Sequence, residues 1–203
     1  FCKSVRLIML VTMPLYLGLG VTAEPAVLTI FGEKWRAMAP MVAVISLAMP
    51  AFTLHILFAP AINALGHARI NLRTSILGAV VMIAAFLVGV RYGAMGLAWA
   101  WVIAFPVMPL ATFLQARHLL GVSATDLARA ILPAMGAAAA MAALVRFLAV
   151  GLETTPAWAS LLAQAGFGGL AYAAIIFVFS RSTLNEMVAL VIRRRPPPEL
   201  APA

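Results

Sequence analysis

Six long stretches of this chain contain at most one charged side chain each, and this pattern restricts the possible folds more than any other feature. An α-helix needs about 20 apolar residues to cross the hydrocarbon core of a bilayer. The stretches reach this length and lack the alternation of a half-buried strand. They predict an all-α, polytopic helical membrane protein with about six transmembrane helices. The predicted spans are Leu7–Ile30, Ala39–Leu65, Leu72–Val90, Met95–Gln115, Ala130–Val150 and Ala157–Phe179.

The basic residues divide unequally between the two sides of these spans. Ten lie on one side and four on the other. The ten are Lys3, Arg6, Arg69, Arg73, Arg117, Arg129, Arg181, Arg193, Arg194 and Arg195; the four are Lys34, Arg36, Arg91 and Arg146. Cytoplasmic loops carry the excess of Lys and Arg. We therefore expect both ends of the chain in the cytoplasm, and we assign the net charge of +8 to topology and not to nucleic-acid binding.

The composition argues against a soluble enzyme. Hydrophobic residues make up 65% of the chain and charged residues 10%, whereas soluble proteins are roughly half apolar and about a quarter charged. No catalytic triad, carboxylate pair, phosphate loop or metal-binding spacing is found in the sequence, and Cys2 is its single cysteine. We expect a protein that is not an enzyme, with no cofactor and no metal.

The predicted spans and the segments between them divide the chain into three parts. Residues 1–122 hold four transmembrane helices. Residues 123–181 hold an amphipathic connector and two peripheral transmembrane helices rich in small residues; Ser123 is the expected N-cap of the connector, with Asp126 in its first turn. Residues 182–203 are expected to form a cytoplasmic juxtamembrane helix, ending in three arginines that face anionic lipids, and a disordered tail.

Several prolines fall inside the predicted spans. Each one removes a backbone hydrogen bond and can kink its helix. Kinked helices are typical of membrane proteins whose helices move, but a static role in packing irregular helices fits the pattern equally well. The prolines are Pro14, Pro50, Pro60, Pro106 and Pro109.

Polar side chains at membrane depth are the candidate site residues, because burying them in hydrocarbon is costly. Glu24, near the outer end of the first span, is a candidate for lining an aqueous cavity or coupling to a cation; the alternatives are that it reaches the outer interface or that the helix ends at Pro25. His55, near the middle of the second span, is a candidate for contacting substrate or carrying a proton, the alternative being a bond to a neighbouring helix. Asn63 lies on the same helix, nearer the cytoplasm.

Arg69 and Arg73 complete the candidate substrate-binding set, at the cytoplasmic mouth of the third span. Their guanidinium groups are suited to a lipid phosphate. The alternative is that they only mark topology.

Three turns carry a resemblance to a known family. The segment 28–47, LTIFGEKWRAMAPMVAVISL, is similar to an "FGxxW" turn that is followed by a proline-containing span in the polysaccharide transporter family of the multidrug/oligosaccharidyl-lipid/polysaccharide exporter superfamily. The segment 64–69, ALGHAR, resembles that family's "AxGR" turn with two intervening residues. The segment 92–98, YGAMGLA, resembles its "xGxxGxA" turn. Whatever the family, glycine suits turns that need a positive φ value or a close approach of two backbones. The four glycines in these turns are Gly32, Gly66, Gly93 and Gly96.

The resemblance implies a flippase or exporter of the bacterial inner membrane that moves polyprenyl-linked oligosaccharide or exopolysaccharide units by alternating access. The chain would supply the last six of fourteen spans, part of the C-terminal lobe of a two-lobed exporter fold. Because it begins with Phe1 and no signal peptide, we expect a fragment of a longer protein. The implied partners are the lipid-linked oligosaccharide and other polysaccharide assembly proteins.

Other functions remain open from the sequence. A cation-coupled multidrug exporter or a peptidoglycan-precursor flippase belongs to the same superfamily. A membrane-embedded glycan polymerase or ligase is the alternative of another class; it would be expected to have a large outer loop, whereas the outer loops predicted here are short.

Overall fold

The computed structural model describes residues 1–152 and 154–179, and these residues form helices joined by short turns. The predicted juxtamembrane helix and tail, 182–203, lie outside the described residues. The helices are α1 (Cys2–Val21), α2 (Ala23–Phe31), the 3-10 helix η1 (Glu33–Met38), α3 (Ala39–Ala64), α4 (Ala68–Gly89), the 3-10 helix η2 (Val90–Tyr92), α5 (Gly93–Ala104), α6 (Val107–Leu120), α7 (Ala124–Val150) and α8 (Ala157–Phe179).

The all-α, multi-pass class predicted from the sequence is confirmed. Five helical stretches among the described residues are long and apolar enough to cross a membrane. The longest, residues 68–120, reverses direction at Gly93, so that α5 packs back against α4. This stretch therefore provides two passes, α4 and the α5–α6 pair, and the total becomes six.

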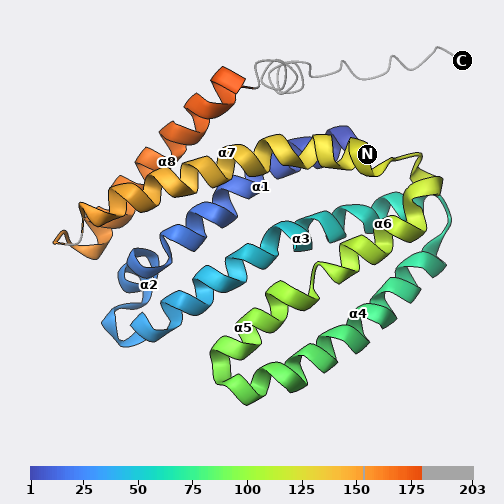
Figure 1. The fold of residues 1–203 in the computed structure, drawn as a ribbon, viewed down its shortest axis with the longest axis horizontal. Coiled ribbons are helices and arrows are strands. Elements are labelled where there is room, and N and C mark those ends of the chain that lie inside the picture. The colour runs from blue at the N-terminus through green and yellow to red at the C-terminus, as the bar shows by residue number, and fades with distance from the viewer. Residues whose placement is uncertain (153, 180–203) are drawn as a thin grey trace, which may run out of the picture.

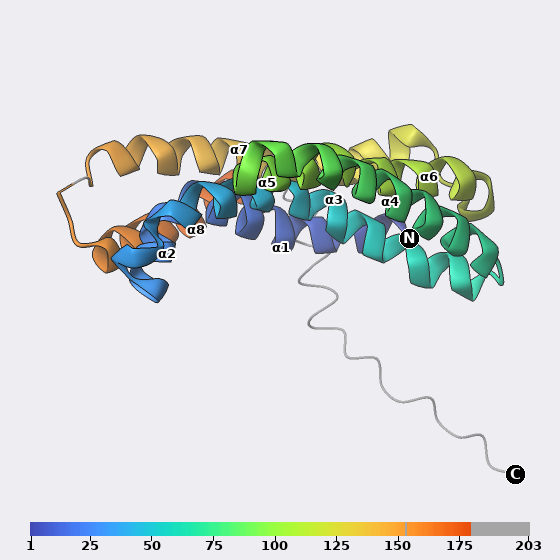
Figure 2. The same cartoon turned by 90° about the horizontal axis from the view of Figure 1, so that it is seen from below.

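The helices lie side by side in a slab (Figures 1 and 2). Their packing order across the slab is α8, α7, α1, α3, the α5–α6 pair and α4. Phe1, the α3–α4 turn and the α6–α7 turn gather at one end of the slab, which we call the N-terminal end. α2, η1, the α4–α5 turn and the α7–α8 turn lie at the other end, which we call the α2 end.

The first predicted span is not one helix. It divides at Thr22 into α1 and α2, because the ring of Pro25 is incompatible with a continuing helical bond to the carbonyl of Val21. At the third position of α2, Pro25 lacks only an amide hydrogen that would have no helical partner there. Thr22 caps the break by donating its hydroxyl to the carbonyl of Gly18, at 2.9 Å. Glu24 therefore lies in the first turn of a new helix.

The fourth predicted span is also divided, between α5 and α6. Pro106 stands at the break, and the backbone there forms a turn between Ala104 and Val107. Proline alone does not decide where a helix ends, because Pro14, Pro50 and Pro60 remain inside their helices.

The region 121–130 differs from the prediction of a separate connector. Ser123 caps the helix as expected, and its hydroxyl and the Asp126 carboxylate form a capping box. However, the helix that starts there continues without interruption to Val150, through Pro133. The connector is therefore the first part of α7.

α7, expected to be a peripheral helix, makes the most extensive helix–helix contact among the described residues, with α1. One face of α7 carries small residues that allow close approach of the two backbones. These residues, Ala130, Ala134, Ala137 and Ala138, are buried against Val5, Met9, Leu10 and Met13 of α1. α8 does lie at the edge of the slab (Figure 1).

The glycines predicted at tight turns behave as expected. Gly32, Gly66 and Gly93 have positive φ values of 85°, 76° and 70°. Gly96 allows close approach: a Cβ atom built there would collide with the carbonyl oxygen of Gly89, and one built at Gly89 would lie 2.7 Å from the carbonyl oxygen of Gly96. The α4–α5 hairpin therefore requires glycine at both positions.

Candidate functional site

The α2 end of the slab holds a polar cavity of about 650 Å³ between α2 and η1 on one side and α7 and α8 on the other. We call it the α2-end cavity. Its polar lining consists of Glu24, Glu33, Arg36, Arg146, Thr155, Ser160 and Gln164. Cavities of a few hundred cubic ångströms are the usual size of small-molecule sites. This cavity combines such a volume with charged and amide groups from four elements.

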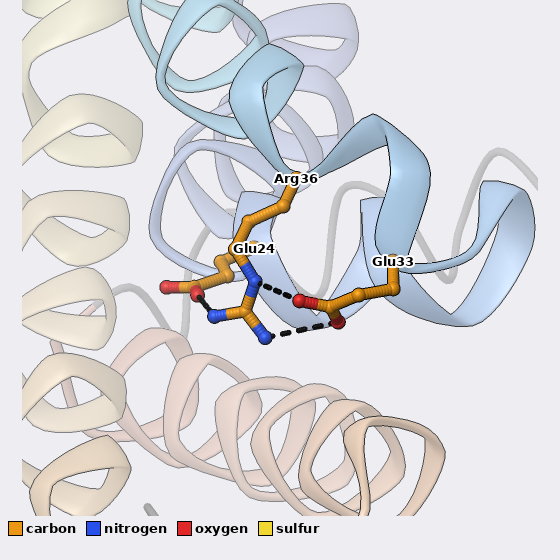
Figure 3. Close-up of polar contacts among 3 residues, drawn as sticks. All are labelled: Glu24, Glu33 and Arg36. Atoms are coloured by element: carbon orange, nitrogen blue, oxygen red, sulfur yellow. Dashed lines mark hydrogen bonds and ion pairs between the residues drawn. The ribbon is translucent and has the colours of Figure 1, made fainter.

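Arg36 connects two acids at one side of this cavity (Figure 3). Its Nε donates to Oε1 of Glu33 at 2.6 Å, and its Nη2 donates to Oε2 of the same carboxylate at 3.0 Å. The remaining terminal nitrogen, Nη1, donates to Oε1 of Glu24 at 2.8 Å. A two-point contact to one carboxylate uses the planar fork of the guanidinium group. Arg36 thereby joins η1 to α2.

Glu24 is thus not an isolated acid at membrane depth. Its side chain is 58% exposed and paired with Arg36. This pairing leaves the carboxylate less suited to binding a coupling cation than a free carboxylate would be.

His55 lies in the middle of α3, half-buried. Its ring meets the ring of Phe105 edge-on, with centroids 6.0 Å apart. The ring atom Nδ1 is buried and forms no hydrogen bond with any described residue. The alternative of a histidine hydrogen-bonded through Nδ1 to a neighbouring helix is therefore not what the structure shows.

Asn63 holds α3 to α4 near the turn that joins them. Its Oδ1 accepts a hydrogen bond from Nδ2 of Asn71 at 2.7 Å, and the same Asn71 nitrogen donates to the carbonyl of Ala59 at 3.1 Å. Arg69 and Arg73 are exposed on the first turns of α4 at this end. The five predicted residues consequently do not form one site: Glu24 lies at the α2 end, His55 in the middle of the slab, and the other three at the N-terminal end. Their role in substrate binding stays a prediction.

The N-terminal end has a smaller cavity, of about 290 Å³. Lys3 and Arg6 of α1 and Asp126 and Arg129 of α7 line it. Within residues 1–152 and 154–179, no three His, Cys, Asp or Glu side chains gather in a way that would hold a metal ion.

The predicted site residues did not include Arg146, Ser160 and Gln164, because the last two spans were expected to be peripheral. The signal was present in α8. Ser160 and Gln164 are four residues apart in an otherwise apolar span, so they lie on one face, and Nε2 of Gln164 donates to Oγ of Ser160 at 2.8 Å. Both side chains are buried.

Two comparisons with known proteins both match proteins of polysaccharide biosynthesis. A family profile described as "Polysaccharide biosynthesis protein" matches residues 1–40, which include Glu24, Glu33 and Arg36. The chain is 25% identical over 188 residues to the succinoglycan biosynthesis transport protein ExoT of Rhizobium meliloti (strain 1021). That alignment covers 90% of this chain and 38% of the relative, so the chain spans well under half of the relative's length. No solved structure matches the chain. The chain is therefore similar to a polysaccharide biosynthesis profile over its first 40 residues and to a polysaccharide transport protein along most of its length.

Proposed function

We propose that this chain is part of an exporter that moves polyprenyl-linked oligosaccharide or exopolysaccharide units across the bacterial inner membrane and catalyses no bond-making step. The observation that carries the proposal is the match along 90% of the chain to a relative that is named a transport protein of polysaccharide biosynthesis. The chain spans 38% of that relative. From the resemblance of its turns, the proposal places these six passes in the last part of a two-lobed transporter.

Alternating access would let a polar glycan cross a core that otherwise excludes it. The divided passes support this mechanism. The first pass breaks at Thr22 and the fourth at Pro106, and helices interrupted in this way bend more readily than continuous ones. We assign to these two breaks the movement of α2 relative to α1 and of α5 relative to α6.

We infer that the N-terminal end faces the cytoplasm. Within the described residues, this end carries six of the ten basic residues counted on that side: Lys3, Arg6, Arg69, Arg73, Arg117 and Arg129. Positive residues near the ends of transmembrane helices are retained inside. In this orientation the cavity lined by Lys3 and Arg129 meets the anionic headgroups of the inner leaflet.

The test is a deletion of the gene in a cell that makes the polymer. We expect lipid-linked oligosaccharide to accumulate in the cytoplasmic leaflet, where a membrane-impermeant oxidant does not reach its sugars in intact cells. Polymer export at the normal rate, with no such accumulation, would count against the proposal. A plasmid copy that carries the natural gene must restore export.

A further inference from the structure

The small cavity at the N-terminal end of the slab has an excess of positive charge. We call it the N-terminal cavity; it lies between α1 and α7 and holds about 290 Å³. Among its described lining residues, Lys3, Arg6 and Arg129 are cationic and Asp126 is the one acid. Oδ2 of Asp126 already accepts hydrogen bonds from the amide and the hydroxyl of Ser123, at 3.1 and 2.5 Å. Cations gathered in this way repel one another, and an anion between them would offset that repulsion.

A long apolar groove runs between α1 and α8, and we call it the α1–α8 groove. It has a volume of about 750 Å³, and Met141 and Val145 of α7 line it between the two helices. Val11 and Leu15 of α1 also line it, and they are 50% and 64% exposed. The groove is therefore open along α1 and offers an apolar surface at membrane depth.

The cavity and the groove follow one another along α1. Lys3 and Arg6 line the N-terminal cavity, whereas Leu10, Pro14 and Gly18 line the groove. Successive members of this series are three or four residues apart, a spacing that places side chains on one side of a helix. The lining thus changes from charged to apolar between Arg6 and Leu10, over about 6 Å along the helix axis.

The length of the groove fits a lipid chain. From Leu10 to Thr22, α1 advances about 18 Å, and one leaflet contributes about 15 Å to the hydrocarbon core of a bilayer. A lipid phosphate in the N-terminal cavity would therefore place its acyl chain in the groove. A free phosphate would fill only the cavity, and an uncharged chain would fill only the groove.

We propose that the N-terminal cavity and the α1–α8 groove together bind one anionic phospholipid. Its phosphate lies between Lys3 of α1 and Arg129 of α7, where both side chains donate to it, and one of its acyl chains lies between α1 and α8. This inference depends on the position of the helices in a membrane and not on transport, so it stands or fails separately from the proposed function.

The experiment locates a photoreactive lipid on the natural full-length protein in phosphatidylcholine nanodiscs. The probe is phosphatidylglycerol with a diazirine at the end of one acyl chain, present as a minor lipid, and mass spectrometry identifies the labelled peptides. We expect labelling within residues 11–22 and 164–177, which include the groove-lining parts of α1 and α8. An excess of unlabelled phosphatidylglycerol should reduce this labelling, whereas added phosphatidylcholine or inorganic phosphate should not.

Two charge substitutions test the phosphate contacts. Lys3→Gln and Arg129→Gln should each lower the affinity for phosphatidylglycerol about fivefold, the contribution of one basic residue near a lipid surface. Arg117→Gln is the matched control, because Arg117 is exposed in the last turn of α6 and does not line the cavity. It removes the same charge and should leave the labelling unchanged.

Two glycines of α8 test the position of the acyl chain. Gly169 lines the groove, and a Cβ atom built there meets no atom within 4 Å, so Gly169→Phe should fill the groove without disturbing the helix packing. We expect this variant to lose most of the labelling in the groove. Gly166→Phe is the control: a Cβ atom at Gly166 also meets no atom within 4 Å, but this residue does not line the groove. It should be labelled like the natural protein.

Four results would overturn the proposal. Unchanged labelling of Lys3→Gln and Arg129→Gln, or equal competition by phosphatidylcholine, would show that the charge of the lipid plays no part. Competition by inorganic phosphate would assign the N-terminal cavity to a free anion. Undiminished labelling of Gly169→Phe would show that the acyl chain does not lie in the groove.

Discussion

Tyr172 of α8 donates a hydrogen bond to the backbone carbonyl oxygen of Leu10 in α1, at 2.6 Å. In an uninterrupted helix the amide of residue 14 would bind this oxygen, but residue 14 is a proline and has no amide hydrogen. A side chain from a neighbouring helix thus replaces the missing bond, which is how prolines are tolerated inside transmembrane helices. The proline in α1 and the tyrosine in α8 form one structural unit.

This relationship predicts coupling between two substitutions. Tyr172→Phe should lower the stability of the protein by about 0.5 to 1.5 kcal/mol, the net value of one hydrogen bond. In a Pro14→Ala background the amide of residue 14 is available to Leu10, so Tyr172→Phe should cost less. Thermal unfolding in one detergent, analysed as a double-mutant cycle, measures the difference.

Tyr92→Phe provides the control for this cycle, because Tyr92 is 75% exposed at the α4–α5 turn. It should leave the unfolding temperature unchanged. Equal costs of Tyr172→Phe in the two backgrounds would show that the tyrosine does not compensate for the proline.

Two glycine substitutions, one in the α4–α5 hairpin and one in α7, should have opposite effects on stability. Gly96→Ala brings a methyl group into the carbonyl oxygen of Gly89 and should destabilise the protein by about 1–3 kcal/mol. Gly136→Ala, in the middle of α7, meets no atom within 4 Å and should stabilise it by roughly 0.5–1 kcal/mol, because alanine favours the helix. The yield of folded protein and its unfolding temperature report both effects. A neutral Gly96→Ala would show that α4 and α5 do not approach as closely as described.

How much of this fold the sequence predicts depends on the element. The number of passes and the N-cap at Ser123 follow from local patterns, which are strong for apolar runs and for capping residues. Whether a given proline ends its helix does not follow from local patterns. Pro14 stays inside a helix because Tyr172 reaches the freed carbonyl from 162 residues away, and no local pattern reveals such a partner.

The same reasoning applies to the candidate site. The polar residues Glu24 and His55 were identifiable because they interrupt apolar runs, but the arrangement around Glu24 depends on the reversal at Gly32. Only that turn brings Arg36 back to Glu24, twelve residues away in the chain. Gln164 was visible as an isolated amide in α8. Its place in the lining of the α2-end cavity appears only once α2 packs against α8.

The proposed orientation predicts which thiols a membrane-impermeant maleimide labels in intact cells. In a background in which Cys2 and every other cysteine of the full-length protein are replaced by serine, Lys34→Cys in η1 should be labelled directly, because Lys34 is exposed at the α2 end. Arg69→Cys, exposed at the N-terminal end, should be labelled only after the inner membrane is permeabilised. The reverse pattern would place the α2-end cavity in the cytoplasm.

The central claim is transport, and reconstitution tests it most directly. The natural full-length protein is placed in liposomes that contain lipid-linked oligosaccharide with a radiolabelled sugar, and the fraction of sugar that an impermeant oxidant reaches is followed over time. We expect the protected inner-leaflet fraction to become accessible much faster than in protein-free liposomes. A rate equal to that of protein-free liposomes, with the protein folded and inserted, would contradict the assignment of this chain to an exporter.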